Sequence, residues 1–243
     1  MAKLIRKDCN NCQACEEFCC VDCFGGEEFN LFQTLSSEEL RYLVEGKQHV
    51  NFRRGETIIK QNTSSTHVAC IRRGLAKVYI EGVKDKNIIL KLVGSSDFIT
   101  GGNLFSNSVR QFTVSAITDM ACCFINSDKV IELYSRNKQF AIELLKIHTH
   151  QNNILLNTLV NLTQKYMPGR VADSLLYLRN EIFKTNPFLI PLSRQELADM
   201  SAMTKESYVR ILKEFKSSGF IEIGRNSIQI LDEETLASIS KNG

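Results

Sequence analysis

The fold of the C-terminal part of this chain is decided by the stretch Leu192-Ser193-Arg194-Gln195-Glu196-Leu197-Ala198, which is continued by Thr204-Lys205-Glu206-Ser207-Tyr208-Val209-Arg210-Ile211-Leu212. The spacing from Ser193 to Glu196 is that of a capping box, which predicts that a helix begins here. A tight break at residues 201–203 follows, and Thr204 caps a second predicted helix that continues to about Lys216. Two helices joined by so short a break have the pattern of a helix-turn-helix unit.

The second predicted helix has two chemically different faces. Its apolar residues recur at helical spacing and predict a buried face made of Tyr208, Ile211, Leu212 and Phe215. Its outer face carries Lys205, Glu206, Val209, Arg210 and Lys213. Arginine can pair with guanine and glutamate can accept from cytosine in the major groove. A predicted hairpin over residues 220–231, turning at 224–227, is consistent with a wing and favours DNA reading over a plain helical hairpin.

The balance of charged residues gives no independent support for DNA binding. Residues 168–243 hold ten Lys or Arg and ten Asp or Glu, so the DNA reading depends on motif geometry. The whole chain has a net charge of +3, with 43% hydrophobic and 23% charged residues, as in ordinary globular proteins. Its 243 residues suit two domains, and no apolar run has the length that a bilayer crossing needs, so no membrane partner is expected.

A long helix with a heptad seam is predicted ahead of this unit. The positions that alternate in steps of four and three are Ala141, Leu145, His148, Asn152, Leu155, Leu159, Leu162 and Tyr166. This spacing is typical of a helix that pairs with a copy of itself, and the alternative is a helix packed on its own domain. Asn152 would fix the register at a cost in stability, and His148 is interpreted as a seam residue and not as a metal ligand. Pro168-Gly169 predicts the end of this helix and a hinge, with a further helix over 170–183.

The middle of the chain reads as β-structure. Between residues 50 and 125, short runs rich in β-branched residues alternate with glycine and polar turns. The predicted strands cover residues 57–59, 68–71, 77–80, 88–93 and 112–117. Strands of this length and spacing predict a compact antiparallel roll or barrel. Ser36 and Glu39, ahead of it, have the spacing of another helix cap.

Six of the nine cysteines lie within residues 9–23. Cys9, Cys12, Cys15 and Cys19 read C-x2-C-x2-C-x3-C, which suits an iron–sulfur cluster, and Cys20 and Cys23 are alternative ligands. Four thiolates suit zinc equally well, although zinc sites usually pair two separated C-x2-C knuckles. A thiol or disulfide switch is the third alternative.

Several classes of protein are disfavoured. Residues 1–7 lack the apolar segment of a signal peptide, so the expected location is the cytoplasm, with reduced thiols. Residues 1–30 hold three basic and six acidic side chains, and this acidic balance does not suit a tail that binds nucleic acid. An enzyme is not expected, since no paired carboxylates, Ser/His/Asp set or phosphate-cradling glycine loop stands out. A single cysteine run gives little support to an electron carrier.

Over about residues 31–231 the chain resembles the cAMP receptor protein/FNR (CRP/FNR) family of transcription regulators. Beyond the helix-turn-helix stretch, the resemblance rests on residues 53–58 (RRGETI), 94–99 (GSSDFI) and 169–172 (GRVA). It implies an α+β fold with a jelly-roll-type antiparallel β-roll like that of cyclic-nucleotide-binding domains, a long dimerisation helix and a C-terminal winged helix-turn-helix. The implied parts are a cysteine-rich segment 1–30, a sensor roll 31–127, a dimerisation region 128–167 and a DNA-binding domain 168–243.

The resemblance also assigns roles in DNA binding. It places base reading on Lys205, Glu206, Val209 and Arg210, and phosphate contacts on Ser193, Arg194 and Gln195. The glycine usual in the family's turn is Ala202 here, and the second helix begins Thr-Lys-Glu where the cAMP receptor has Ser-Arg-Glu. The implied partners are a palindromic duplex operator, a second copy of the chain and RNA polymerase.

The signal implied by the resemblance is a redox one. The family's cyclic-nucleotide contacts fall on Gly101, on Arg110-Gln111 and on Leu155-Leu156, which argues against cyclic AMP. FNR-like members bind a 4Fe–4S cluster through three N-terminal cysteines and one in the roll, a position that falls on Cys123 beside Cys122. Their spacing, C-x2-C-x5-C, differs from this one, so the ligand set stays open, and Cys70 is interpreted as core. The leading hypothesis is a regulator that senses oxygen, nitric oxide or redox state, and the alternative is an effector-binding roll with structural zinc on the cysteines.

Overall fold

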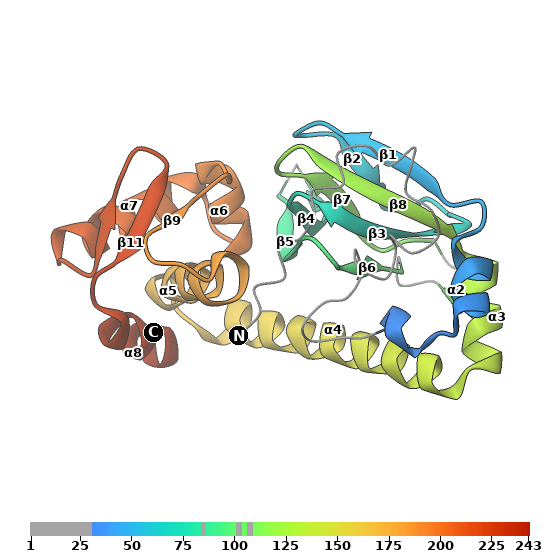
Figure 1. The fold of residues 1–243 in the computed structure, drawn as a ribbon. Helices are drawn as coiled ribbons and strands as arrows, with labels where there is room; N and C mark the ends of the chain where they lie inside the picture. The colour runs from blue at the N-terminus through green and yellow to red at the C-terminus, as the bar shows by residue number, and fades with distance from the viewer. Residues whose placement is uncertain (1–30, 84–85, 101–103, 106–108) are drawn as a thin grey trace. The chain divides into compact units, whose positions relative to one another are not determined.

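The computed structural model describes residues 31–243 apart from 84–85, 101–103 and 106–108 (Figure 1). It divides into two compact units. The first runs to Ala76 and includes Val93–Gln151, and the second comprises Lys77–Leu92 with Asn152–Gly243. In the described part of the chain, no helix has both the length and the hydropathy that crossing a bilayer requires.

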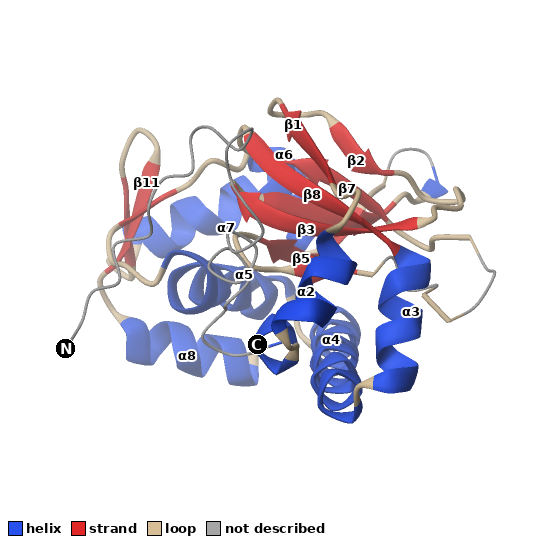
Figure 2. Cartoon of the chain, turned by 45° about the vertical axis from the view of Figure 1, so that its right-hand side comes forward, coloured by secondary structure: helices blue, strands red, loops and turns tan. Residues whose placement is uncertain are grey.

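Two four-stranded sheets make the β-roll, drawn in red in Figure 2. One sheet has the order β1 (Gln48–Phe52), β8 (Met120–Asn126), β3 (His67–Arg73) and β6 (Phe98–Ile99). The other has the order β2 (Thr57–Ile59), β7 (Thr113–Ala116), β4 (Ala76–Ile80) and β5 (Ile88–Val93). The strand pairs β1–β8, β3–β8, β3–β6 and β2–β7 are all antiparallel. The predicted antiparallel roll is therefore confirmed.

Helices on the first unit cover its core. They are η2 (Leu31–Thr34), α2 (Ser37–Val44), α3 (Ser127–Arg136) and the first part of α4 (Lys138–Gln164). Ser36 and Glu39 form the predicted capping box at the start of α2. Phe140, Leu144 and Ile147 place one face of α4 in the hydrophobic core of this unit.

The break after α4 differs from the prediction. The helix ends at Gln164, and Pro168 lies in the first turn of the next helix, α5 (Met167–Tyr177). The first turn of a helix tolerates proline because its N–H groups have no partner within the helix there. A π-helical turn, η4 (Leu178–Phe183), continues α5 to the predicted end at Phe183.

The C-terminal part of the second unit is a winged two-helix motif. It contains β9 (Phe188–Leu189), α6 (Arg194–Met200), α7 (Lys205–Ser217), β10 (Ile221–Ile223), β11 (Ser227–Ile230) and α8 (Glu233–Asn242). β10 and β11 form the predicted hairpin, and β9 adds a third strand in the order β10-β11-β9. The sequence analysis did not foresee β9 or α8.

Candidate DNA-binding site

A reciprocal cap fixes the start of α6. The Ser193 hydroxyl accepts from the backbone N–H of Glu196 at 3.2 Å, and the Glu196 carboxylate accepts from the backbone N–H of Ser193 at 2.8 Å. This arrangement confirms the predicted capping box. Ser193 and Gln195 are exposed and Arg194 is half-buried, so the three predicted phosphate contacts lie at the first turn of the helix.

The turn between the helices is held in an unusual backbone conformation. Ala202 has φ +46°, in the left-handed region that glycine adopts at least cost. The Ala202 carbonyl accepts from Arg170 Nη1 at 3.2 Å, and the backbone N–H of Met203 donates to the Ala198 carbonyl, also at 3.2 Å. The turn therefore keeps the geometry for which glycine is preferred, although it carries an alanine.

Packing against α5 sets the orientation of α7. Thr204 caps this helix, and its hydroxyl accepts from the backbone N–H of Ser207 at 3.2 Å. The four residues of the predicted inner face are all buried, as expected: Tyr208, Ile211, Leu212 and Phe215. The Tyr208 hydroxyl lies 3.0 Å from that of Ser174 on α5, and burial raises the pKa of Tyr208 to about 12. The phenol is therefore a neutral hydrogen-bonding group that joins the two helices.

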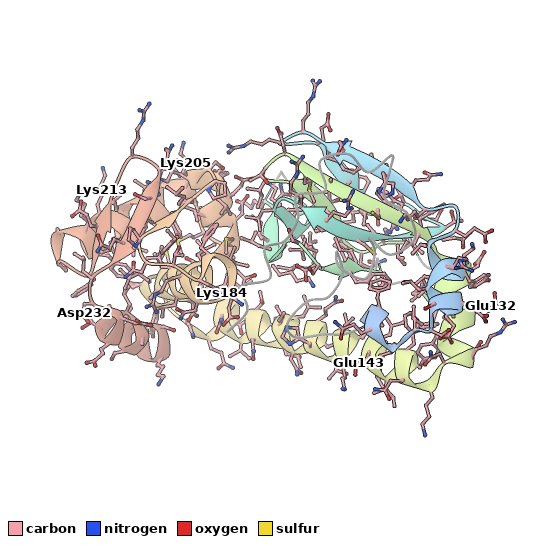
Figure 3. The ribbon with its side chains drawn as sticks, viewed as in Figure 1. Glu132, Glu143, Lys184, Lys205, Lys213 and Asp232 are labelled. Carbon is pink, nitrogen blue, oxygen red and sulfur yellow. The ribbon has the colours of Figure 1, made fainter. Side chains whose placement is uncertain are left out.

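The outer face of α7 is polar and open to solvent. Lys205, Glu206, Arg210 and Lys213 are exposed, and Val209 is half-buried. Figure 3 labels Lys205 and Lys213. Arg210 Nη1 donates to Glu214 Oε1 at 2.6 Å, one helical turn further on. The structure thus brings the predicted base-reading set together on one exposed face.

The long helix α4 also carries apolar side chains that are exposed, apart from the core residues named above. Its exposed apolar side chains are Ile142, Leu145, Leu155, Leu156, Leu159 and Val160. Within the predicted seam, Asn152 is exposed, whereas Ala141, His148 and Leu162 are half-buried and Tyr166 follows the helix end. The seam analysis did not include Leu156 or Val160, which broaden the apolar stripe.

The three cysteines in the described part of the chain, Cys70, Cys122 and Cys123, are buried and form no disulfide bond there. Cys122 and Cys123 are neighbours on β8, so their side chains point to opposite faces of the sheet. Burial raises the pKa of the Cys122 thiol to about 12. Cys123 pairs in register with His49 on one side and Cys70 on the other, and its Sγ lies 3.2 Å from His49 Nδ1.

The N-terminal metal candidates lie outside the described residues: Cys9, Cys12, Cys15, Cys19, Cys20 and Cys23. Among the described side chains, no group of three or more His, Cys, Asp or Glu is arranged to hold a metal ion. Cys70, interpreted as core from the sequence, is fully buried in the hydrophobic core of the first unit.

Two family models match the chain in sequence order. A cyclic nucleotide-binding domain matches residues 49–137, and a Crp-like helix-turn-helix domain matches residues 169–239. The chain is a DNA-binding transcription regulator of the CRP/FNR family. Its fold agrees with that assignment, because the roll, the long helix and the winged motif follow one another in the expected order.

Individual relatives in the CRP/FNR family are distant. The CRP-like cAMP-activated global transcriptional regulator of Mycobacterium tuberculosis is 23% identical over 211 residues, which cover 85% of this chain and 94% of the relative. Transcriptional activator protein FnrA of Stutzerimonas stutzeri is 23% identical over 201 residues, covering 77% and 78%. The structure of FixK2 from Bradyrhizobium japonicum gives a TM-score of 0.73 at 18% identity, covering 79% of this chain and 96% of that one. The Mycobacterium and Stutzerimonas relatives are named as a transcriptional regulator and a transcriptional activator, and the likeness to the FixK2 structure is one of fold.

Arg110 stands at one of the positions that contact the cyclic nucleotide in the family, so a cationic side chain is kept there. Arg110 is 5% exposed, its Nη2 donates to the His67 carbonyl at 2.8 Å, and its buried Nε has no hydrogen-bond partner. Burial lowers the pKa of this guanidinium. Gly101, at the family's glutamate position, lies outside the described residues, and Leu155-Leu156 are exposed and apolar.

Sequence reasoning missed two ion pairs at this CRP/FNR DNA-binding site. The pair Arg210–Glu214 has the spacing of adjacent helical turns, so the sequence did carry a signal for it. The pair between Lys77 Nζ and Glu196 Oε1, at 2.8 Å, joins residues 119 positions apart. No local pattern could have indicated this second pair.

Proposed function

We propose that this regulator is a homodimer that senses oxygen, nitric oxide or redox state through a cysteine-ligated iron–sulfur centre of the 4Fe–4S type. The observation that carries the sensing proposal is the crowding of six cysteines into residues 9–23. A thiolate-held cluster supplies an oxidant-labile centre in a segment that is too short to bury a core of its own. In the dimer, that centre controls pairing of the subunits and thereby the affinity for DNA.

The proposed ligands are Cys9, Cys12, Cys15 and Cys19, with Cys20 and Cys23 as alternatives. If the roll supplies a ligand, the geometry favours Cys123 over Cys122. Cys123 lies under the exposed His49 of the edge strand β1, and Cys122 points to the opposite face of the sheet. The imidazole beside Cys123 is a polar neighbour of the kind that orients a metal ligand.

Dimerisation through α4 is supported by its exposed leucines. A twofold dimer presents two copies of α7, which read two half-sites about one helical turn apart on a palindromic operator. Base reading is assigned to Lys205, Glu206, Val209 and Arg210. Phosphate contacts are assigned to Ser193, Arg194 and Gln195. Thr204 and Lys213 complete the proposed DNA-binding set, and a phosphate contact is also the role proposed for Lys213. RNA polymerase is the further partner that we propose for a regulator of this family.

Arg210→Ala is expected to cost about 1–3 kcal/mol at one base pair of the operator and to relax the preference there, because a bidentate contact to guanine is lost. The measurement is the Kd for the operator and for its single-base variants at fixed salt concentration. Lys213→Ala serves as the control, since loss of a phosphate contact weakens all sequences alike and lowers the salt slope by about one. Equal weakening of operator and unrelated DNA by Arg210→Ala would place Arg210 on a phosphate instead.

Anaerobic purification tests the sensing proposal. The chain is expected to be coloured, with absorbance at about 400 nm and iron and sulfide in about four-to-four ratio per chain. Its affinity for an operator, selected from random duplexes with the anaerobic protein, is expected to fall when air is admitted. A colourless protein with about one zinc per chain, whose DNA binding ignores air, would refute the sensing proposal.

Arg110 supports a second candidate function. A buried guanidinium whose Nε has no partner and whose Nη2 donates to a backbone carbonyl is a ready partner for an anion. In this alternative the roll binds a small anionic effector and the cysteines hold structural zinc. DNA binding that responds to such a molecule and is indifferent to oxygen would favour it.

A further inference from the structure

The helix α6 carries two acidic side chains close to its proposed phosphate contacts. Glu196 and Asp199 are one turn apart on this short helix, and Glu196 follows directly after Ser193, Arg194 and Gln195. Carboxylates at this place oppose the approach of a DNA phosphate, because like charges repel strongly where water is partly excluded. Their charge therefore needs a counter-ion if the helix is to bind DNA.

A lysine from a distant strand supplies that counter-ion. Lys77 on β4 contacts Glu196 at 2.8 Å, and the two side chains are only 19% and 17% exposed. Burial would raise the pKa of Glu196, but hydrogen bonds from Lys77 and from the Ser193 backbone hold it below its ordinary value. Burial raises the pKa of Asp199, and the charge of Lys77 opposes that rise. Lys77 thus contacts Glu196 directly, whereas the Asp199 carboxylate accepts from Gln195 Nε2 at 2.7 Å.

The hairpin that carries Lys77 has a second attachment. The hairpin consists of β4 and β5, and in β5 the backbone N–H of Leu92 donates to the Tyr177 hydroxyl of α5 at 3.2 Å. The Lys77 ammonium also lies over the Tyr79 ring, 5.3 Å from its centroid. Residues 77–92 accordingly belong to the same compact unit as residues 152–243. The hairpin is thus attached to α6 through Lys77 and to α5 through Leu92, and together these contacts hold the Lys77 ammonium beside α6.

We propose that Lys77 is a positioning residue for DNA binding, which neutralises Glu196 so that the side chains of Ser193, Arg194 and Gln195 can contact a phosphate. The inference rests on the proposed role of Ser193, Arg194 and Gln195. Lys77 itself does not touch DNA. Its contribution passes through the carboxylate of Glu196, which at the same time caps the helix.

The test compares the full-length anaerobic chain with its variants, using the selected operator and an unrelated duplex at several salt concentrations. Lys77→Gln is expected to weaken binding to both duplexes about 10-fold, because phosphate contacts are common to all sequences. A loss confined to the operator would overturn the proposal. Direct contact of Lys77 with phosphate would also weaken both duplexes, and the Glu196→Gln background separates it from the proposal, because the loss would then persist there. Lys77→Arg is expected to stay within about 3-fold of wild type, since its charge is kept.

Two further variants separate this role from a structural one. Glu196→Gln keeps the capping box, because glutamine serves at that position, and is expected to bind DNA at least as tightly as wild type. In the Glu196→Gln background, Lys77→Gln is expected to have little further effect. If adding Lys77→Gln to Glu196→Gln weakens DNA binding about 10-fold, the proposal is overturned. A weakening of about 10-fold by Glu196→Gln alone overturns it as well, and this second test remains decisive if Lys77→Gln fails to fold.

Lys86→Gln is the matched control, as it removes the same charge from an exposed position on the same hairpin. It is expected to bind as wild type does, and a loss equal to that of Lys77→Gln would overturn the proposal in favour of a general charge effect. Failure of the proposed function looks different. In that case the wild-type chain itself has no operator preference and Arg210→Ala changes nothing, whatever Lys77→Gln does.

Discussion

The Leu155→Glu/Leu159→Glu double variant is expected to be monomeric and to bind a palindromic operator at least about 100-fold more weakly than the native chain. Leu155 and Leu159 are 42% and 59% exposed on α4, one heptad step apart. In the proposed twofold dimer each substitution acts twice, so the seam contacts of four leucines are lost, at about 1 kcal/mol each, because about half of each side chain is left to bury on pairing. Four carboxylates at the seam add repulsion, and the two half-sites then have to be bound by separate chains.

Light scattering for mass and fluorescence anisotropy for operator affinity give the two measurements. The matched control is Asn157→Glu/Gln164→Glu, which adds the same charge at exposed positions of α4 on the side away from the seam. The control is expected to remain dimeric. If the Leu155→Glu/Leu159→Glu chain stays dimeric, α4 does not pair with its copy, and the alternative of a helix that serves only its own domain gains support.

Serine in place of all six N-terminal cysteines is expected to abolish iron and sulfide binding and to remove the response of DNA binding to air. Thiolates hold iron–sulfur clusters, and a serine hydroxyl does not ionise readily enough to replace them. The six positions are Cys9, Cys12, Cys15, Cys19, Cys20 and Cys23. Iron and sulfide analysis, absorbance, and operator binding before and after air exposure measure the effect.

Single replacements within the roll refine this result. Cys70→Ala removes a thiol from the hydrophobic core and is expected to leave the iron content unchanged, so it controls for the loss of any cysteine. Cys123→Ala is expected to lower the iron content if the roll contributes a ligand, and to leave it unchanged if the N-terminal set suffices. A six-serine chain that still loses operator affinity in air would contradict cluster sensing, because the response would then need no N-terminal thiol.

The parts of the fold that sequence predicted are those with a local signal. Ser193 and Glu196 predicted the start of α6 because a capping box lies within four residues. The leucine spacing predicted a helix that the structure places at Lys138–Gln164, and glycine turns separated the strands of the roll. Helix α3 was missed because it begins directly after β8, with Asn126 as both the last strand residue and the cap.

The parts that sequence could not supply depend on distant contacts. Alanine itself gives no sign of a positive φ at position 202, since it rarely adopts that conformation, and only the resemblance to a family turn with glycine there hinted at it. The pairing of Lys77 with Glu196 exists because folding brings β4 to α6, and neither segment shows a local sign of it. Assignment of the six N-terminal cysteines to a ligand set remains a prediction, because they lie outside the described residues.

Asn152 is the polar residue among the leucines of the predicted α4 seam, and it bears on which chains can pair in a cell that contains several regulators of this kind. If two identical chains pair through α4 as proposed, each Asn152 amide would meet its own copy and both would find a hydrogen-bond partner. In a mixed pair with a paralogue that has leucine at the equivalent position, the Asn152 amide would be buried without a hydrogen-bond partner, at a cost of about 1–3 kcal/mol. In the proposed α4 dimer, the asparagine would therefore disfavour mixed subunits, so that duplicated genes could diverge toward separate signals without exchanging subunits.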